Sequence, residues 1–413
     1  MRIRLRFPAG RLVAASLLLG LLAGASARGA DGGRDALRAR LRAERRRIEQ
    51  LAGLATAAPP ADAMDAVRTY AVPSDGSRDA AAAINRAIRA AGGRPLFFPA
   101  GIYLLGDSIR PIAGTKLYFS PQAELRRGFE GGNGDGRGAL LQGPASFGAH
   151  DVVVVGGNWT NPEHRYSGRA LTIIGSRWEV DAIRVSSWGP AQAPSSCVNV
   201  AGTDIAMRRC VLTGSAGKIN QDGIRVMCGE RITISDCYVE SGDDCFCAFP
   251  TETNQGVLTG RGLADVRFER CFGFSTAARF LACGETAVTV LLGRATMSQL
   301  NAVPVSGIRF EDCAGLSETS APHAPAFFVV SADTAPGATV SAIRFVGCAG
   351  IGGRAAMQAG LLNTAPGARC TDIIMEHCSL AGGRGKVLTI TPTCSAVRIV
   401  DCSLDGIRTT RSQ

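Results

Sequence analysis

The chain has 413 residues, of which 46% are apolar and 19% are charged, and it contains 51 glycines. This length and apolar content allow a large core, and so much glycine favours many tight turns over a few long helices. The formal charge of +10 is concentrated in residues 1–60, which hold 12 basic and 4 acidic residues. The remaining 33 basic and 31 acidic residues give residues 61–413 a net charge of only +2. This near-neutral body, without phosphate loops or nucleic-acid motifs, argues against a nucleic-acid partner.

The first residues have the pattern of an export signal. A basic leader precedes the apolar run "LVAASLLLGLLA", and small residues follow at Ala25 to Ala27. This order is typical of a secretory signal peptide, and the apolar run is shorter than the roughly 20 residues that span a bilayer. We therefore predict a signal peptide over residues 1–27 and a secreted or periplasmic protein, with an uncleaved anchor as the alternative.

Residues 28–66 are predicted to form a basic helix followed by a linker. Leu37, Leu41, Ile48 and Leu51 share one helical face and arginines cover the others, while "ATAAPPADA" has the composition of a linker. A basic helix of this kind can contact an anionic membrane or cell-wall polymer. It can equally be a solvated helix packed on the domain, or a loose pro-like segment. The sequence favours this second interpretation.

A repeated pattern organises the rest of the chain. The pattern apolar-x-apolar-x-x-Cys occurs seven times, at intervals of 24 to 42 residues. The seven copies end at Cys210, Cys237, Cys271, Cys313, Cys348, Cys378 and Cys402. Each copy alternates with period two, as a short half-buried strand does, and a repeat of 20–50 residues indicates a solenoid. Two or three short strands per repeat, with uneven loops and almost no helical period, predict an all-β, right-handed parallel β-helix.

The repeated cysteines should stack as one internal column. Equivalent residues of successive coils lie about 4.8 Å apart, a spacing that a disulfide allows. Free thiols also pack well as small apolar groups, and we expect free, stacked thiols because the pattern repeats a core position. The fourteen cysteines include no pair of CxxC motifs and no CxxC beside histidine. They therefore predict no metal site.

The start of the solenoid carries the first family resemblance. A D-G turn at Asp75 and Gly76 precedes a predicted helix over Asp79 to Ala91, which ends at Gly92 and Gly93. A strand then leads into "FPAGIY", and a short amphipathic helix can close the first coil of a solenoid. This stretch resembles the N-terminal segment of the pectate lyase superfamily. The resemblance implies a parallel β-helix domain over residues 67–413 with a short N-terminal capping helix.

Three aspartates are the candidate catalytic residues. Asp222 precedes the doublet Asp243 and Asp244 by one coil length, so stacking should bring the three carboxylates together. Carboxylates held close to one another repel, which raises the pKa of at least one of them. An inverting glycosidase uses one carboxylic acid to protonate the leaving oxygen and another to activate water. Gly242 lets the chain turn, so that both members of the doublet can face the same groove.

These residues also resemble glycoside hydrolase family 28, the polygalacturonase-type enzymes. Asn220 to Asp222 and Gly242 to Asp244 match the N-x-D and G-D-D motifs of that family. The resemblance implies that Asp243 is the general acid, that Asp222 and Asp244 hold the attacking water, and that no cofactor is needed. It also implies that Asn220 and Arg279 contact a polysaccharide substrate.

The sequence departs from the family downstream of these motifs. Arg279 stands where the family has the histidine of its G-H-G, and the strand "AFFVVSA" lacks the basic residues of its R-I-K. Two alternatives to hydrolysis therefore stay open. One is a polysaccharide lyase in which the aspartates hold Ca²⁺ and Arg279 abstracts the proton. The other is a carbohydrate-binding or adhesion solenoid without catalysis.

Overall fold

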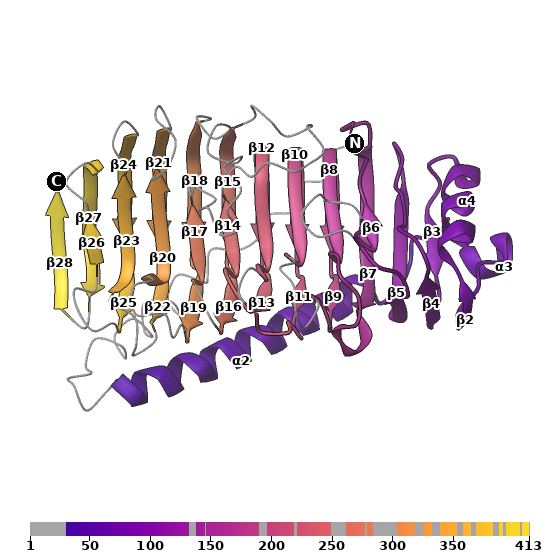
Figure 1. The fold of residues 1–413 in the computed structure, drawn as a ribbon, viewed down its shortest axis with the longest axis horizontal. Helices are drawn as coiled ribbons and strands as arrows, with labels where there is room; N and C mark the ends of the chain where they lie inside the picture. The colour runs from indigo at the N-terminus through magenta and orange to yellow at the C-terminus, as the bar shows by residue number, and fades with distance from the viewer. Residues whose placement is uncertain are drawn as a thin grey trace.

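The structure of the protein is a computed structural model. It describes residues 30–131, 138–144, 146–189, 196–218, 221–248, 262–276, 279–283, 304–318, 325–332, 339–352, 358–364, 369–382, 388–390, 394–404 and 407–412. The predicted signal peptide and Asn220 lie outside these residues. A right-handed parallel β-helix is confirmed (Figure 1).

The strands form three ladders, of which B and C begin in the first coils and A begins at β6. Ladder A contains β6 (Leu141–Gln142), the first parts of β8 (Leu171–Asp181), β10 (Val198–Arg208) and β12 (Ile224–Ser235), then β14 (Phe246–Ala248), β17 (Leu281–Cys283), β20 (Pro325–Ala332), β23 (Gln358–Thr364) and β26 (Leu388–Ile390). Ladder B contains β1 (Met64–Asp65), β3 (Leu96–Phe98), the first parts of β5 (Lys116–Arg127) and β7 (His150–Thr160), the second parts of β8, β10 and β12, then β15 (Leu263–Glu269), β18 (Val305–Glu311), β21 (Thr339–Val346), β24 (Arg369–Glu376) and β27 (Cys394–Leu404).

Ladder C follows ladder B in each coil. It contains β2 (Asp75–Asp79), β4 (Gly101–Leu105), the second parts of β5 and β7, then β9 (Arg184–Val185), β11 (Val211–Leu212), β13 (Tyr238–Ser241), β16 (Phe272–Ser275), β19 (Ala314–Ser317), β22 (Ala349–Ile351) and β25 (Ser379–Ala381). A 3₁₀ turn, η1 (Pro162–His164), lies between β7 and β8.

The repeated sequence pattern marks the corner between ladders B and C. The residue before each column cysteine has a positive φ, for example 49° at Asp236 and 51° at Arg270. This left-handed conformation turns the chain, so that the next residue, Cys237 or Cys271, is buried in the core. The corner residues also pair across coils, with Arg270 Nη2 2.8 Å from Asp236 Oδ2. The corner geometry therefore fixes the cysteine position but allows varied residues before it.

Glycine is required at the corner between ladders A and B. Gly202 and Gly229 stack on successive coils with φ of 142° and 119°. A Cβ on Gly202 would lie 1.8 Å from the carbonyl oxygen of Gly175 in the preceding coil. Only glycine allows the coils to approach this closely.

The core combines the cysteine column with stacked aromatic rings. All fourteen cysteines are buried and free. From Cys271 onward, the column thiols donate to carbonyl oxygens of the preceding coil, as Cys313 Sγ does to Phe268 O and Cys348 Sγ to Phe310 O, both at 3.4 Å. Burial raises the pKa of both thiols well above its usual value. Buried, protonated thiols of this kind act as small apolar groups that complete the coil.

The two ends of the solenoid are closed in different ways. At the N-terminal end, α3 (Ala66–Tyr70) and α4 (Ala81–Ala91) pack against the first coils, and the predicted capping helix is confirmed. Ile84 and Ile88 of α4 are buried, and Gly92 ends the helix with φ 59°. At the C-terminal end, β28 (Ile407–Ser412) pairs antiparallel with β27. This pairing occupies the edge that the last parallel coil would otherwise present.

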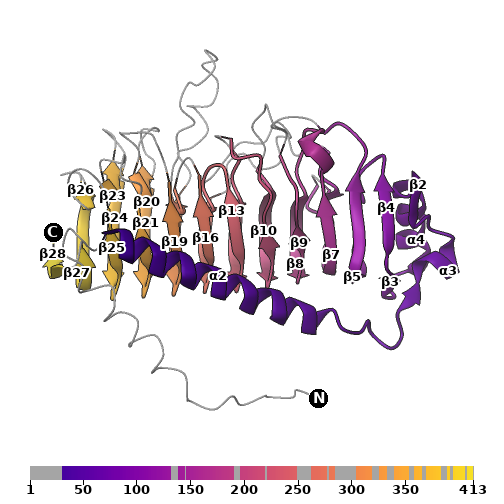
Figure 2. The same ribbon diagram turned by 90° about the horizontal axis from the view of Figure 1, so that it is seen from below.

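The basic helix α2 (Ala30–Ala55) lies along the outer face of ladder C (Figures 1 and 2). Leu37, Leu41 and Ile48 are buried against an apolar row that includes Tyr238 and Phe272. The guanidinium groups of the helix approach the same rings, at 5.8 Å for Arg45 over Tyr238 and for Arg40 over Phe272. Hydrophobic burial therefore holds α2 to the solenoid along several coils.

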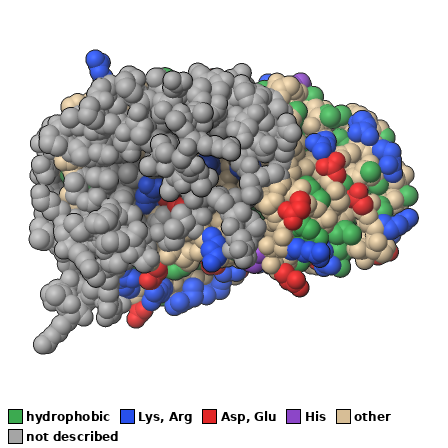
Figure 3. All heavy atoms as spheres, in the orientation of Figure 1, with side chains coloured by type: hydrophobic (Ala, Val, Ile, Leu, Met, Phe, Trp, Pro, Cys, Tyr) green, Lys and Arg blue, Asp and Glu red, His purple; other side chains and the backbone are tan. Residues whose placement is uncertain are grey.

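The arginines of α2 pair with acids of the solenoid. Arg47 lies 2.9 Å from Asp236, Arg45 lies 3.1 Å from Glu240, and Arg38 lies 2.6 Å from Glu318. Figure 3 shows basic and acidic side chains together along the lower edge of the view, where α2 runs in Figure 1. The expected contact of this helix with an anionic surface is not supported, because its apolar face and several of its arginines are used within the molecule. No helix among the described residues is long and apolar enough to cross a membrane.

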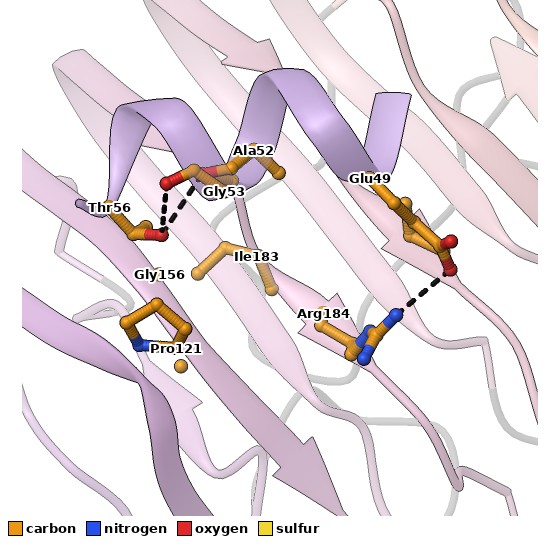
Figure 4. A pocket seen from close by; sticks show the side chains of 11 residues that line it. Glu49, Ala52, Gly53, Thr56, Pro121, Gly156, Ile183 and Arg184 are labelled. Atoms are coloured by element: carbon orange, nitrogen blue, oxygen red, sulfur yellow. Dashed lines mark hydrogen bonds and ion pairs between the residues drawn. The ribbon is translucent and has the colours of Figure 1, made fainter. Parts of the chain in front are cut away.

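A small pocket lies where the C-terminal part of α2 meets the solenoid (Figure 4). Ala52, Gly53 and Thr56 line one wall, and Ile183 lines the other. The ion pair between Glu49 and Arg184, 2.9 Å long, lies beside it. The small side chains near the end of the helix leave this gap, so the pocket belongs to the packing of α2.

Candidate active site

The acidic cluster forms where ladder A begins in three successive coils. Register pairs Ile224 of β12 with Phe246 of β14, and Phe246 with Leu281 of β17. Asp222, Asp244 and Arg279 each stand two residues before these partners. Backbone hydrogen bonds continue through the turn, from Gly223 N to Asp244 O at 2.8 Å and from Cys245 N to Arg279 O at 3.1 Å. The three charged residues therefore occupy one column.

Asp243 lies beside this column, in the turn between β13 and β14. Its carbonyl oxygen accepts hydrogen bonds from the hydroxyls of Ser241, at 2.6 Å, and Ser275, at 2.7 Å. Its backbone N–H donates to the carbonyl oxygen of Gln221 at 3.2 Å. A Cβ on the preceding Gly242 would lie 2.3 Å from the carbonyl oxygen of Lys218. This close approach lets the chain turn between Ser241 and Asp243.

The structure brings the three predicted carboxylates together. One oxygen from each of Asp222, Asp243 and Asp244 lies within 4.8 Å of the others, and all three residues are buried. Asp243 is the most accessible, at 8% exposed, and Asp244 the least, at 1%. The predicted binding residue Asn220 lies outside the described residues.

Two arginines neutralise two of the carboxylates. Arg279 donates from Nε and Nη2 to the two oxygens of Asp244, each at 2.7 Å, and its backbone N–H donates to Oδ1 at 3.1 Å. Arg225 Nη2 lies 2.6 Å from Asp222 Oδ2. The bidentate pair of Arg279 with Asp244 holds that carboxylate in a fixed orientation. Arg279 is therefore placed to position Asp244.

Burial dominates the electrostatics of Asp222. Loss of solvation raises the pKa of Asp222 above its usual value, and the charge of Asp244 adds to the rise. Arg225 and Arg279 act in the opposite direction without cancelling it. Burial lowers the pKa of Arg225, but the charges and hydrogen bond of its neighbours, Asp222 first among them, together outweigh burial and raise that pKa above its usual value. Arg225 therefore stays charged, while Asp222 retains a proton more readily than an ordinary aspartate.

The arginine pairs bear on the lyase alternative. A cation held by the three aspartates would have to share Asp222 and Asp244 with guanidinium groups that already bind them. Arg279 also uses two of its donor nitrogens on Asp244, which leaves it poorly suited to abstract a substrate proton. Both features make the calcium-dependent scheme a weaker fit to this arrangement than acid catalysis by carboxyl groups.

Sequence reasoning missed Arg225. It stands three residues after Asp222, one position into β12, where its side chain shares the outer face of ladder A with the cluster. The alternation of β12 carried that signal, because Ile224 and Val226 are buried core residues and the residue between them must point outward.

Comparisons with known proteins agree with this fold and locate the family resemblance. Residues 145–263 match the model of glycosyl hydrolases family 28. The match contains all three aspartates and ends before Arg279, where the sequence departs from the motifs of the family. The resemblance to that family is therefore confirmed for the part of the chain that carries the candidate acids. A search of curated proteins found no match.

Solved structures show the same fold at low identity. The hyperthermoactive exopolygalacturonase from Thermotoga maritima is 12% identical with a TM-score of 0.51, covering 89% of this chain and 98% of its own. The endo-xylogalacturonan hydrolase from Aspergillus tubingensis is 14% identical with a TM-score of 0.55, covering 80% and 90%. The polygalacturonase from Erwinia carotovora ssp. carotovora is 13% identical with a TM-score of 0.51, covering 78% and 97%.

Proposed function

We propose that this chain is a secreted or periplasmic glycoside hydrolase that cleaves a polysaccharide by inversion. The observation that carries the proposal is the buried cluster of Asp222, Asp243 and Asp244, within the residues that match a glycoside hydrolase family. Burying three carboxylates in contact costs stability, and such costs are typical of sites with a catalytic purpose.

The accessibility of the three groups suggests their roles. Asp243 is the most exposed of them, so it is the group that can reach the glycosidic oxygen and protonate it as the general acid. Asp222 and Asp244 lie deeper and are held by Arg225 and Arg279. These two side chains can hold the attacking water, and the one that is ionised accepts its proton. Arg279 then acts by positioning Asp244, and Asn220 is proposed to contact the sugar.

The same burial favours water attack over a covalent intermediate. A retaining enzyme needs a carboxylate that bonds to the anomeric carbon. The side chain of Asp244 is only 1% exposed and both of its oxygens are bound by Arg279. The oxygens of the cluster approach more closely than the roughly 6.5–9.5 Å between the carboxyl groups of inverting enzymes. The side chain of Asp243 must therefore turn outward when sugar and water enter.

The proposal is tested with the Asp243→Asn variant. We expect turnover on the best polysaccharide substrate to fall at least about 100-fold, because the general acid is lost. Circular dichroism and the melting temperature should stay close to those of the wild type. Asp265→Asn is the matched control and should keep full activity, because the side chain of Asp265 is 47% exposed and pairs only with the exposed Arg267 among the described residues.

The assay should follow reducing ends and the ultraviolet absorbance of unsaturated products together, with and without EDTA. New reducing ends without absorbance indicate hydrolysis, and proton NMR of the first product then gives its anomeric configuration. Retained activity in Asp243→Asn would remove Asp243 from the mechanism. Absorbance that EDTA abolishes would establish a lyase. If no polysaccharide gives a product, the alternative of a carbohydrate-binding solenoid without catalysis is favoured.

A further inference from the structure

A row of polar residues extends from the acidic cluster along ladder A. Register pairs Gln142 with Thr172, Thr172 with Asn199, and Asn199 with Arg225, the partner of Asp222. The four residues occupy one position on four successive coils, and they share the outer face because their neighbours along each strand are core residues. We call Gln142, Thr172 and Asn199 the polar row.

Each member of the polar row is buried and has an atom without a partner in the part of the chain that the structure describes. The exposed fractions are 8% for Gln142, 2% for Thr172 and 1% for Asn199. The atoms without partners are Gln142 Oε1, Thr172 Oγ1 and Asn199 Nδ2. Leaving a buried polar atom unpaired costs about 1–3 kcal/mol. Three such atoms side by side therefore indicate a position where a ligand supplies the missing hydrogen bonds.

Hydrogen bonds to neighbouring residues fix the orientation of Asn199. Arg169 Nε, which can only donate, donates to Ser196 Oγ at 3.0 Å. The single hydroxyl proton of Ser196 then goes to Asn199 Oδ1 at 2.7 Å. The oxygen of the amide is thereby identified, and Asn199 Nδ2 remains as a donor.

The row offers both donors and acceptors. Gln142 Nε2 donates to the carbonyl oxygen of Gly143 at 3.0 Å, so Gln142 Oε1 remains as an acceptor. Asn199 Nδ2 is a donor, and Thr172 Oγ1 is both. A sugar hydroxyl both donates and accepts, and can satisfy all three atoms. A carboxylate only accepts, so the carboxylate group of a uronate cannot pair with Gln142 Oε1, and any sugar must use a hydroxyl there.

The surroundings of the row also fit a sugar chain. Strands of neighbouring coils lie about 4.8 Å apart, so the two coil steps from Gln142 to Asn199 place successive sugar residues opposite successive members of the row. Two residues further along the same strands, Ile174 and Ala201 form an apolar patch with Phe147 packed against it. Sugar rings combine polar edges with apolar faces, and a polar row beside an apolar patch matches both.

We propose that the polar row binds neutral sugar residues of the polysaccharide, on the N-terminal side of the acidic cluster. This inference rests on the proposed function for the location of the cleaved bond, and it adds the chemistry of the sugars that precede or follow that bond. The row recognises hydroxyl groups, in contrast to the arginine-rich cluster next to it.

The test is the Thr172→Val variant, which keeps the shape of the side chain and removes the hydroxyl. Binding is measured by calorimetry in the Asp243→Asn background, which is expected to prevent cleavage. The probes are neutral gluco-, galacto- and xylo-oligosaccharides, as disaccharides and hexasaccharides, with galacturonate oligomers of the same lengths. We expect a neutral hexasaccharide to bind about fivefold more weakly to the variant, the worth of one neutral hydrogen bond. Binding of disaccharides at the cluster should not change.

Two controls separate recognition from structure. Thr233→Val makes the same chemical change on ladder B of β12 and should leave every affinity unchanged. The melting temperature of Thr172→Val should equal or exceed that of the wild type, since the hydroxyl has no partner in the described chain. A structural hydroxyl would instead lower it.

Several results would overturn the inference. These are unchanged hexasaccharide affinity, an equal loss for disaccharide and hexasaccharide, an equal loss for galacturonate oligomers, or a crystal structure in which ordered water alone satisfies the row while an oligosaccharide binds elsewhere. The proposed function fails separately. Weakened binding of neutral hexasaccharide without any hydrolysis by the wild type would contradict the enzyme and support the row.

Discussion

The outer faces of ladder A and ladder C are both covered, but in opposite ways. On ladder C, α2 buries an apolar row that includes Tyr238 and Phe272, and its arginines pair with acids at the rim. On ladder A, the covered groups include carboxylates, partly buried guanidinium groups, a hydroxyl and amides beside an apolar patch, and several polar atoms have no partner in the described chain. The first face resembles an ordinary core, and the second does not.

This difference separates stability from function within one fold. Covering a sheet with leucine and isoleucine stabilises it through hydrophobic burial. Burying Asp222, Asp244 and their arginines contributes little net stability, and apolar residues of similar size would often contribute more. The polar face of ladder A therefore fits the proposed function better than a role in stability. Weakening each face in turn should give different results.

The largest change in stability is expected from Arg279→Met. Among the described residues, the substitution leaves the buried carboxylate of Asp244 with the backbone N–H of residue 279 as a remaining hydrogen-bond donor. Breaking a buried ion pair costs about 3–5 kcal/mol of stability. We therefore expect the free energy of unfolding, measured in urea, to fall by about 4 kcal/mol. Activity should fall with it, since Asp244 is no longer held.

The control for this prediction is Arg309→Met. Arg309 pairs with Glu311 at 2.8 Å on the exposed side of β18. The free energy of unfolding of Arg309→Met should be lower than that of the wild type by about 1 kcal/mol or less. Equal losses at the two arginines would show that Asp244 is not buried as a charge, and would remove the contrast between the two faces.

Most of the fold could be predicted from the sequence because its signals are local and repeated. Seven copies of one strand pattern defined the coils, and Gly92 marked the end of the capping helix. Asp222 and the doublet at Asp243 and Asp244 could be brought together because coil length alone places them. In each case, spacing along the chain determines spacing in the structure.

The contacts of ladder A and α2 could not be predicted in the same way. The pairing of Arg225 with Asp222 and of Arg279 with Asp244 depends on the register between coils of unequal length, which no local pattern gives. The polar row has the same origin, since Thr172 and Asn199 are ordinary strand residues until their neighbours are known. The face that α2 covers was also hidden, because its apolar residues are spread over many coils.

A moderate loss of stability is expected from Ile48→Ala on the other face. Ile48 is fully buried between α2 and ladder C. Truncating a buried isoleucine to alanine costs about 2–5 kcal/mol. We expect a value near 2 kcal/mol, because the helix can shift toward the gap. Urea unfolding and the rate of proteolysis near α2 measure the effect.

Leu54→Ala on the same helix is the matched control. Leu54 is 75% exposed, so its truncation should leave stability unchanged. If Ile48→Ala also leaves stability and proteolysis unchanged, α2 does not dock on ladder C in solution. The anionic-surface interpretation of the helix would then regain support.

The smallest expected effect is a pH dependence of stability that comes from Asp222 on the polar face of ladder A. Burial raises the pKa of Asp222 above the roughly 3.9 of an unfolded aspartate. The folded protein therefore binds a proton that the unfolded chain has released, so the stability linked to this group is complete below the unfolded pKa and is lost as the pH rises through the folded one. Urea unfolding across this range should show that the free energy of unfolding of the wild type, minus that of Asp222→Asn, falls as the pH rises.

The direction in which this stability difference between wild type and Asp222→Asn changes with pH decides between two descriptions of the cluster. If it falls with rising pH, burial and the neighbouring carboxylates dominate Asp222, and the cluster keeps a proton within reach of the substrate. If it rises, the attraction of Arg225 dominates and Asp222 is an ordinary member of an ion pair. In that case Asp222 is ionised at neutral pH and can only accept a proton from water. The proposed role of Asp243 as the acid is the same in both cases, because Asp243 is the most exposed of the three and Arg279 binds both oxygens of Asp244.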